Sequence, residues 1–299
     1  MVYAEGYVYV LMKIDIVCPL YEAENEIDAF LTRLQTQTGI DFGKVVFPVT
    51  KSEGYEKTVE KLEKQGYTWF LVEKEEFSHS LTREKAIREY CENDVVIMIS
   101  QDVVLMHDNA LLELANSVNE EVAFAYGKQI CTKKTIEHYV RQKNYGAESA
   151  IIGKEDIERL QLKAFFASDA FSAYYRPTFL KLGGYDGVPM MMNEDMYYAK
   201  KIIDAGYKKA YVATAVVEHS HKLKLKQLYK RYYDTGVWFS QHPEFDGFKT
   251  TDTGFKLALY VFKKALLGFN IPVLFRFIPD MCARYFGMKK GKKVAQKEN

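Results

Sequence analysis

The sequence has few of the residues on which several common protein classes depend. It contains only four cysteines, Cys18, Cys91, Cys131 and Cys282, and no two of them form a CxxC pair. We therefore expect neither a zinc knuckle nor a disulfide framework, but reduced thiols in a cytoplasmic protein. The first residues lack a basic segment followed by a long apolar core, which is not typical of a signal peptide. No apolar run reaches the ~18 to 20 residues that span a bilayer.

Charge is distributed unevenly along the chain. Residues 255–299 contain eight Lys and two Arg against Asp280 and Glu298, a local charge of +8. The formal net charge of the whole chain is +1, so the first 254 residues carry about −7. A basic tail on an acidic body favours contact with an anionic membrane over binding to nucleic acid.

Short apolar runs alternate with segments of helical periodicity from Lys13 onward. With 48% apolar residues, a chain of 299 residues can bury a substantial core. The alternation predicts an α/β fold with a largely parallel sheet. Strands are expected at 14–17, 44–49, 68–72, 95–99 and 122–126, and helices at 27–34, 55–65, 81–90 and 107–118. The second half predicts an interrupted helix over 135–157, a strand over 165–175, a helix over 194–205, and two short strands within 209–219, broken near Thr214.

The segment CPLYEAENE, residues 18–26, follows the first predicted strand and contains no glycine. Neither a GxGxxG nor a GxxxxGK[ST] phosphate loop can form there, which excludes the commonest nucleotide-binding folds. Pro19 stiffens the exit from the strand, and Tyr21 and Glu22 are able to hold a base by stacking and hydrogen bonding. An ordinary strand-to-helix turn is the alternative.

The unbroken apolar run at 95–99 predicts a strand buried on both faces of the sheet. It leads directly into Ser100, Gln101 and Asp102. Ligands of open α/β sheets bind outside the carboxyl ends of the strands. Asp102 is therefore a candidate oxygen ligand for a divalent cation, and a helix N-cap or a solvated loop charge are the alternatives.

Two further candidates precede the central strand. His79 and Arg83 lie in the loop and first turn of the helix predicted at 81–90. An arginine there is able to clamp a diphosphate through two hydrogen bonds. The alternative is an exposed arginine paired with Glu84 or Glu89.

The second half supplies carboxylates and histidines. Glu194 and Asp195 begin a predicted helix, where acidic residues are often explained by the helix dipole. A carboxylate in this place is also able to act as a general base. His219 and His221 occupy alternate positions at a strand end, so only one of them faces a given site, and a structural histidine is the alternative.

Several segments in this order resemble a known enzyme family. The loop CPLYE, the loop SHSLTRE, the strand end SQD, the GGYD turn, the helix start NED and the strand end EHSH resemble inverting family 2 glycosyltransferases of the type A fold. The segments ISQDV, AYGKQ, KNYGAES, FFASDAFSAYYR and KRYYDTGVWFSQH are similar to bacterial rhamnosyltransferases that use dTDP-rhamnose. The resemblance spans roughly residues 13–242.

The resemblance implies a type A glycosyltransferase fold, an α/β fold with a mixed sheet flanked by helices and a C-terminal helical extension. It implies a catalytic domain over 13–240 and a basic amphipathic helical tail over 241–299. The implied reaction is inverting transfer of L-rhamnose from dTDP-rhamnose to a hydroxyl of a cell-surface polysaccharide or lipid-linked glycan. A UDP-hexose donor and a non-catalytic membrane adaptor stay open, whereas a nucleotidyltransferase would need the glycine-rich loop that is absent.

The resemblance also implies roles for individual residues. The implied donor-binding residues are Pro19, Tyr21, Glu22, His79, Arg83, Gln101 and Asp102. Asp102, with His219 or His221, would hold Mg²⁺ or Mn²⁺. Asp195, or else Glu194, would be the catalytic base, and Asp169 would lie on the acceptor side. The chain departs from the family where the Asp-any-Asp motif is Ser100, Gln101, Asp102, and where Glu22 and Glu84 replace the usual asparagines.

The basic tail predicts where the protein works. Residues 255–267 and 275–286 interleave apolar and basic side chains, which is typical of helices that lie in a membrane interface. We therefore expect a cytoplasmic protein held peripherally at the inner face of the cell membrane. A helical cap on the domain or a homodimer interface are the alternatives for this tail.

Overall fold

The computed structural model describes residues 2–4, 7–9, 11–220, 223–248 and 251–298. The chain forms two compact units. The first comprises Met1–Gln129, Ala147–Glu155 and Phe165–His219, and the second comprises Ile130–Gly146, Asp156–Ala164 and Ser220–Asn299. These units divide the chain after His219 and not at residue 240. The functional boundary expected at 240 therefore stays a prediction.

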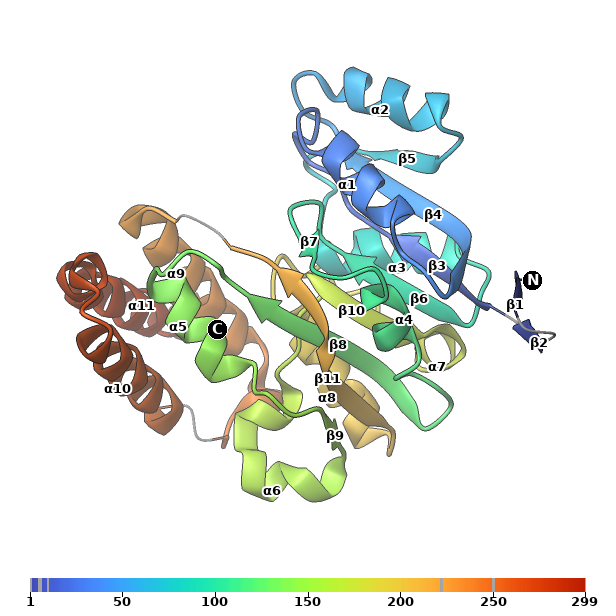
Figure 1. The fold of residues 1–299 in the computed structure, drawn as a ribbon. Helices are drawn as coiled ribbons and strands as arrows, with labels where there is room; N and C mark the ends of the chain where they lie inside the picture. The colour runs from blue at the N-terminus through green and yellow to red at the C-terminus, as the bar shows by residue number, and fades with distance from the viewer. Residues whose placement is uncertain (1, 5–6, 10, 221–222, 249–250, 299) are drawn as a thin grey trace. The chain divides into compact units, whose positions relative to one another are not determined.

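The first unit is built on a mixed sheet of nine strands (Figure 1). The strands lie in the order β5-β4-β3-β6-β10-β8-β11-β7, and β9 pairs with β11. Their bounds are β3 Met12–Val17, β4 Ile40–Thr50, β5 Thr68–Val72, β6 Val95–Ile99, β7 Val104–Leu105, β8 Val122–Ile130, β9 Ala150–Ile152, β10 Phe171–Tyr175 and β11 Lys208–Glu218. A separate antiparallel pair is formed by β1 Val2–Ala4 and β2 Tyr7–Tyr9.

The strands β5, β4, β3 and β6 run parallel to one another, and β10 pairs antiparallel with both β6 and β8. All five residues of β6 are buried, which confirms the prediction for this central strand. Helices cover the sheet, namely α1 Ile27–Gln35, α2 Tyr55–Lys64, α3 His79–Glu89, α4 Ala110–Ala115, α7 Arg176–Lys181 and α8 Glu194–Asp204. The predicted apolar stripe of α1 (Ile27, Phe30, Leu31 and Leu34) is buried in the core. The mixed sheet flanked by helices is the fold class expected from the sequence.

Four sequence-based expectations for secondary structure were wrong in their bounds or continuity. The strand β11 is continuous from 208 to 218, because Thr214 stays in the strand with an exposed side chain whose hydroxyl bonds Glu113. The helix expected at 107–118 is only α4, because the His107 ring bonds Asn109 and the carbonyl of Thr214 outside the helix. The strand expected over 165–175 begins only at Phe171, after the 3-10 turn η2 Gln161–Phe165.

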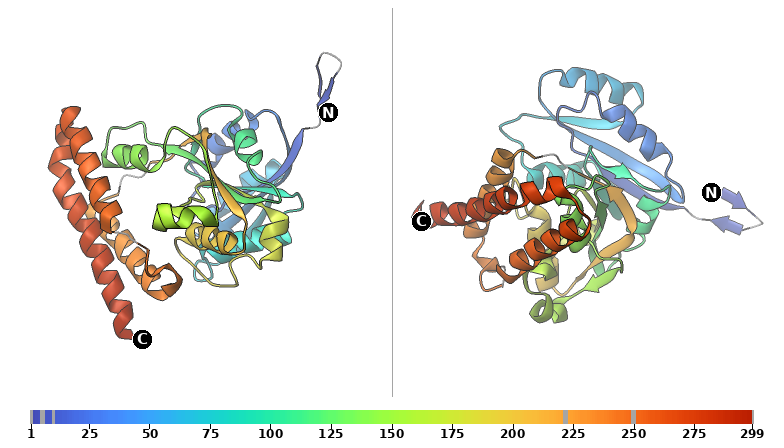
Figure 2. Two further views of the ribbon diagram at one scale, coloured as in Figure 1. Left: turned by 90° about the horizontal axis from the view of Figure 1, so that it is seen from below. Right: turned by 60° about the vertical axis from the view of Figure 1, so that its left-hand side comes forward.

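The helix expected over 135–157 also ends early, at Asn144. The second unit contains α5 Ile136–Asn144, α6 Ile157–Leu160, α9 Leu225–Gln241, α10 Thr251–Leu267 and α11 Ile271–Glu298, of which α10 and α11 are the long orange and red helices of Figure 2. Its core joins Tyr139 of α5, Val261 and Ala265 of α10, and Val273 of α11. Among the described residues, no helix combines the length and apolar character needed to cross a bilayer.

Glycines let α9 and α11 approach closely. A Cβ atom on Gly291 would lie 2.1 Å from the carbonyl oxygen of Tyr233, and one on Gly287 would lie 2.6 Å from that of Tyr229. On the facing helix, a Cβ on Gly236 would lie 2.4 Å from the carbonyl oxygen of Met288. Backbone atoms cannot move aside as flexible side chains do. These glycines are therefore required by packing.

Candidate functional site

Strand pairing brings four chain segments to one edge of the sheet. The parallel strands β3 and β6 end side by side, since Val17 pairs with Met98. The antiparallel strand β10 starts at the same edge, since Phe171 pairs with Ile99. The end of β11 reaches the loop after β6, since Glu218 pairs with Val104 of β7.

Gln101 ties the loop after β6 to the loop after β3. Its Oε1 accepts a hydrogen bond from the backbone N–H of Tyr21 at 2.8 Å, and its Nε2 donates to the Tyr21 carbonyl at 3.0 Å. The same Nε2 donates to Glu26 at 2.8 Å. Gln101 therefore acts as a structural link between these two loops.

Asp102 and His219 form a pair at this edge. Asp102 Oδ2 lies 3.4 Å from His219 Nε2, and the Asp102 side chain is 32% exposed. His219 Nδ1 lies 2.9 Å from Oε1 of Gln129, and Gln129 Nε2 donates to Ser168 Oγ at 2.7 Å. Because a carbonyl oxygen only accepts hydrogen bonds, Nδ1 is the nitrogen that donates to Gln129, and Nε2 is the nitrogen that faces Asp102.

This pair fits a hard divalent cation. A carboxylate oxygen and an imidazole nitrogen converge, and the remote ring nitrogen is held by a hydrogen bond, the usual arrangement of a ligating histidine. Mg²⁺ is commonly held by one or two protein groups together with waters and substrate phosphates. In the described part of the chain, no group of three or more His, Cys, Asp or Glu side chains is placed to hold a metal ion. His221, the other candidate ligand, lies outside the described residues.

A second group, which we call the acidic cluster, consists of Arg83, Asp169, Glu194 and Asp195. Arg83 Nη1 lies 2.5 Å from Glu194 Oε1, and its Nε lies 3.9 Å from Asp169 Oδ2. Arg83, Asp169 and Glu194 are all buried. Burial acts to lower the pKa of Arg83, but Glu194 and Asp169 together raise it. The guanidinium is therefore permanently charged and holds two carboxylates in place.

Tyrosines complete the surroundings of Asp169. Its Oδ1 accepts hydrogen bonds from Ser172 Oγ and Tyr174 Oη, both at 2.7 Å, and its Oδ2 accepts from Tyr185 Oη at 3.3 Å. Burial raises the pKa of Asp169, while Arg83 acts in the opposite direction. The lone pairs of Asp169 are thus directed at protein donors.

Asp195 differs from its neighbours in the acidic cluster because it is only partly buried. Its Oδ1 accepts from the backbone N–H of Met196 at 2.7 Å, and its Oδ2 accepts from that of Asp169 at 3.2 Å. Burial first, and then the charges of Glu194 and Asp169, raise the pKa of Asp195 well above its usual value. A raised pKa makes this carboxylate a stronger base.

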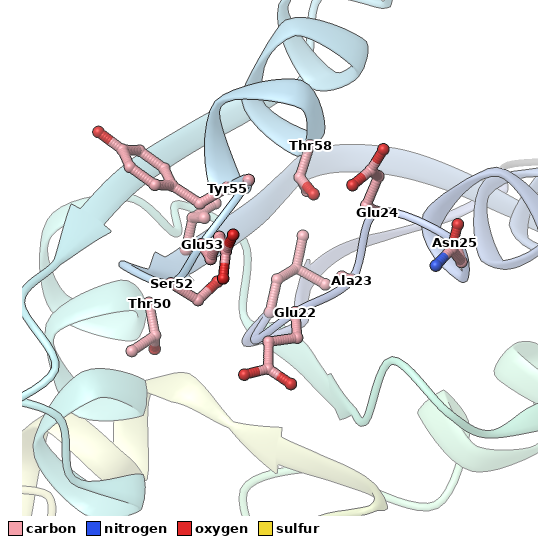
Figure 3. Close-up of a pocket in the computed structure, with 12 residues that line it drawn as sticks. Glu22, Ala23, Glu24, Asn25, Thr50, Ser52, Glu53, Tyr55 and Thr58 are labelled. Carbon is pink, nitrogen blue, oxygen red and sulfur yellow. The ribbon is translucent and has the colours of Figure 1, made fainter.

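A pocket of about 270 Å³ opens where β3 and β4 end (Figure 3). Its wall carries three carboxylates, Glu22, Glu24 and Glu53, together with Thr50 and Ser52. Glu22 has a left-handed backbone with φ 51°, which is unusual for a residue other than glycine. Tyr21 is 41% exposed beside this loop, with the Lys74 ammonium 5.6 Å from its ring.

The structure adds Lys209, which sequence reasoning missed. This residue of β11 is fully buried, donates to the carbonyl of Phe166 and lies 5.2 Å from the Tyr126 ring. Burial lowers the pKa of Lys209 to about 7, and Asp195 opposes this shift. The sequence feature that could have indicated a buried lysine was its position within a largely apolar strand.

The structure thus sorts the predicted residues into groups. Asp102 lies with His219, and Asp169, Glu194 and Asp195 lie with Arg83. Arg83 was expected either to clamp a diphosphate or to be an exposed arginine paired with Glu84 or Glu89. It is buried and paired with Glu194, so the exposed alternative is wrong, and the contact with a diphosphate stays a prediction. Pro19 lies in the loop after β3, and His79 begins α3 with its ring 5.0 Å from Phe77.

Comparison with known proteins finds close relatives of one kind. The O-antigen chain rhamnosyltransferase RfbN of Salmonella typhimurium is 31% identical over 303 residues, which cover 93% of this chain and 95% of the relative. The O-antigen chain rhamnosyltransferase WbaN of Salmonella anatum is 34% identical over 243 residues, which cover 74% of this chain and 77% of the relative. No family model matches the chain.

Solved structures with the same fold are more distant in sequence. The mannosyltransferase PcManGT from Pyrobaculum calidifontis, in complex with GDP-Man and Mn²⁺, superposes with a TM-score of 0.56 at 15% identity. The superposition covers 95% of this chain and 74% of that one. At this identity, the likeness establishes a shared fold.

Proposed function

Because the chain belongs to the glycosyltransferase family of the O-antigen chain rhamnosyltransferases, we propose that it transfers L-rhamnose from dTDP-rhamnose to a hydroxyl of a growing O-antigen-type polysaccharide. The transfer inverts the configuration of the anomeric carbon. The observation that carries the proposal is that one sheet edge holds both the Asp102–His219 pair and the acidic cluster with Asp195. An inverting displacement needs both a stabilised leaving group and a base on the opposite face of the sugar.

Asp102 and His219 serve the donor side. These two residues would hold a divalent cation, which would neutralise the negative charge on the diphosphate leaving group. The pocket at Glu22 serves the base of the donor. Its three carboxylates repel a diphosphate but accept hydrogen bonds from base N–H groups, such as the imide N–H of thymine.

Asp195 serves the acceptor side as the catalytic base. It is the only carboxylate of the acidic cluster that is partly exposed, so an acceptor hydroxyl is able to approach it. Glu194 is the expected alternative, but its pairing with Arg83 and its burial favour a positioning role. Arg83 then orders the cluster.

A panel of nucleotide sugars tests the donor. Thermal shift and hydrolysis are measured for dTDP-rhamnose, UDP-glucose, UDP-galactose and GDP-mannose, each with and without Mn²⁺. We expect dTDP-rhamnose to stabilise the protein most and to turn over fastest. A clear preference for a UDP-sugar would retain the glycosyltransferase and discard rhamnose, and the absence of any nucleotide binding would favour a non-catalytic adaptor.

The variant Asp102→Ala tests the metal. We expect it to abolish transfer and to remove the Mn²⁺ dependence of nucleotide binding while the melting temperature of the free protein stays near that of the wild type. Asp108→Ala is a matched control, since Asp108 is an exposed aspartate in the loop before α4. Normal turnover by Asp102→Ala would contradict the assignment.

We also propose that the second unit docks on an anionic membrane from the cytoplasmic side. The turn between α10 and α11 exposes large apolar side chains, with Phe269 85%, Ile271 52% and Phe275 82% exposed. Lys263 and Lys264 flank this surface on α10. Each basic residue near an anionic surface adds roughly 1 kcal/mol of attraction.

Liposome co-sedimentation of the full chain tests the membrane contact. We expect the double variant Phe269→Ser, Phe275→Ser to lose binding to anionic vesicles. The control is Ile151→Ser, since Ile151 is an exposed apolar residue (62%) of the first unit. Equal binding by wild type and double variant, or no binding by the wild type, would overturn the proposal.

A further inference from the structure

The second unit contains a larger pocket, of about 440 Å³, that the proposed reaction does not use. Residues of the helices α5, α9 and α11, and of the loops that precede α5 and α9, line it. The lining residues are Cys131, Lys133, Lys134, Thr135, Ile136, Glu137, Ser220, Leu223, Lys224, Leu228, Pro272, Val273, Arg276 and Asp280. Ile136, Leu228 and Val273 are buried and provide apolar walls, while Lys133, Lys134 and Lys224 are exposed.

Within the residues that the structure describes, the three lysines of the pocket have no carboxylate nearby that neutralises their charge, whereas its other charged groups are paired. Its two carboxylates are both bound by Arg284, whose Nη2 lies 2.8 Å from Glu137 and whose Nε lies 2.6 Å from Asp280. Arg276 lies 3.9 Å from Asp280 and balances the remaining negative charge. Among the described residues, no carboxylate pairs with Lys133, Lys134 or Lys224. The pocket therefore carries a surplus of about three positive charges.

Helix dipoles add to this positive potential. The helices α5, α9 and α11 begin at Ile136, Leu225 and Ile271, and the pocket is lined by residues at each of these starts. Figure 1 shows the three helices together in the second unit. Each helix N-terminus carries a partial positive charge of about half an elementary charge. Three such ends and three lysines around one cavity favour an anion strongly.

The apolar walls of the pocket indicate which kind of anion it binds. A site for inorganic phosphate alone would be polar throughout, whereas this pocket has buried aliphatic walls. The wall formed by Arg276 lies one residue, or about 100° around α11, from the exposed Phe275. A chain attached to the anion would therefore run from the basic rim along the apolar walls, close to the apolar surface of the same helix.

We propose that this pocket binds the phosphate group of an amphiphile, with the first carbons of its apolar chain against Ile136, Leu228 and Val273. The site lies wholly within the second unit. Its occupant is a phosphate-bearing lipid or lipid-like molecule, not a soluble sugar nucleotide, which has no apolar chain. The proposal goes beyond the glycosyl transfer and does not depend on the identity of the donor sugar.

Calorimetric titration of the full chain, without donor or metal, tests the site. The probes are inorganic phosphate, butyl phosphate, hexyl phosphate and hexanol. We expect hexyl phosphate to bind most tightly, with affinity rising up to about fourfold for each added methylene, as burial of apolar carbon predicts. Binding of inorganic phosphate equal to that of hexyl phosphate would reduce the site to a plain anion site and overturn the proposal.

Matched charge variants locate the binding. The double variant Lys133→Gln, Lys224→Gln removes two charges from the rim, and Lys256→Gln, Lys263→Gln removes two exposed charges of α10 that do not line the pocket. We expect the first variant to weaken hexyl phosphate binding at least tenfold and the second to change it less than twofold. Equal weakening by both would show general electrostatics and overturn the site. These outcomes do not depend on whether any nucleotide sugar binds. The proposed glycosyl transfer and the proposed phosphate site are therefore tested independently of each other.

Discussion

Asp102 and Asp195 lie at the same edge of the sheet, but their surroundings differ in charge and exposure. Asp102 is about one third exposed (32%) and faces a histidine held through Gln129. Asp195 lies beside two further carboxylates, and their charges and burial raise its pKa. The first environment keeps the ligand atoms accessible, which suits a cation. The second favours proton uptake, which suits a base, and the difference shows how one sheet edge supports two roles for the same residue type.

The largest expected effect is the loss of turnover when Asp195, the proposed base of the acidic cluster, is replaced. General-base assistance is typically worth ~10² to 10⁴-fold, so Asp195→Asn should lower turnover by about that factor. Donor affinity should stay nearly unchanged, because the proposed role of Asp195 is on the acceptor side. Steady-state kinetics with donor and acceptor varied separately measure both. Near-normal turnover would remove Asp195 as the base; loss of turnover in Glu194→Gln would then assign the role to Glu194, and activity of both variants would make Asp169 the next candidate.

The pH dependence of turnover tests the difference between the surroundings of Asp195 and those of Asp102. The base must be deprotonated, and burial beside Glu194 and Asp169 raises the pKa of Asp195 well above its usual value near 4. Turnover should therefore fall as pH decreases through this raised pKa, at a pH where an ordinary aspartate is still ionised. A rate profile that stays flat down to about pH 4.5 would show that the environment of Asp195 does not set the rate.

Breaking the buried ion pair between Arg83 and Glu194 should lower the free energy of unfolding more than it lowers turnover. Glu194→Gln leaves the Arg83 guanidinium buried with Asp169 as its remaining carboxylate. Loss of one partner of a buried pair typically costs about 3 to 5 kcal/mol. We expect chemical denaturation to show a loss of this order, while the exposed control Glu24→Gln, which pairs with Lys57, loses less than about 1 kcal/mol. Equal, small losses would show that Arg83 does not depend on this pair.

A smaller effect is expected when the Asp102–His219 pair loses its support. Gln129→Leu removes the acceptor that fixes the proton on His219 Nδ1. Changes to groups behind a metal ligand typically cost about 10- to 100-fold in metal affinity. Mn²⁺ binding followed by electron paramagnetic resonance should weaken within that range, and Gln129→Glu, which keeps an acceptor, should recover most of it. Unaltered Mn²⁺ affinity in Gln129→Leu would separate His219 from the metal.

The smallest expected effect concerns Lys209. Its folded pKa of about 7 lies below the usual 10.5 of the unfolded chain. Between these values the unfolded state binds more protons, so folding stability rises with pH across this window. Lys209→Met should lack this rise, which is about 2 kcal/mol between pH 7 and pH 9. Parallel stability curves for the two proteins would contradict the buried, partly neutral lysine.

The parallel half of the fold could be predicted because its signals are local. The apolar runs at 68–72 and 95–99 became β5 and β6 with the expected bounds. A strand buried on both faces needs continuous apolar residues, which is the case for β6, whereas the edge strand β5 is buried only at Phe70 and Val72. The antiparallel half was predicted less well. Thr214 interrupted the apolar pattern of β11 without ending the strand, because pairing with neighbouring strands continues past an exposed side chain.

The sequence by itself determined the candidate residues, since Asp102 follows a buried strand and Asp195 begins a helix whatever surrounds them. Only the tertiary structure decided their partners. Arg83 and Glu194 are separated by 111 positions, and His219 and Gln129 by 90, so no local pattern links them. Burial then decided the roles: it placed Arg83 between two carboxylates and left Asp195 partly exposed. Such effects depend on the distance between charges and on the exclusion of water, which arise only when the chain has folded.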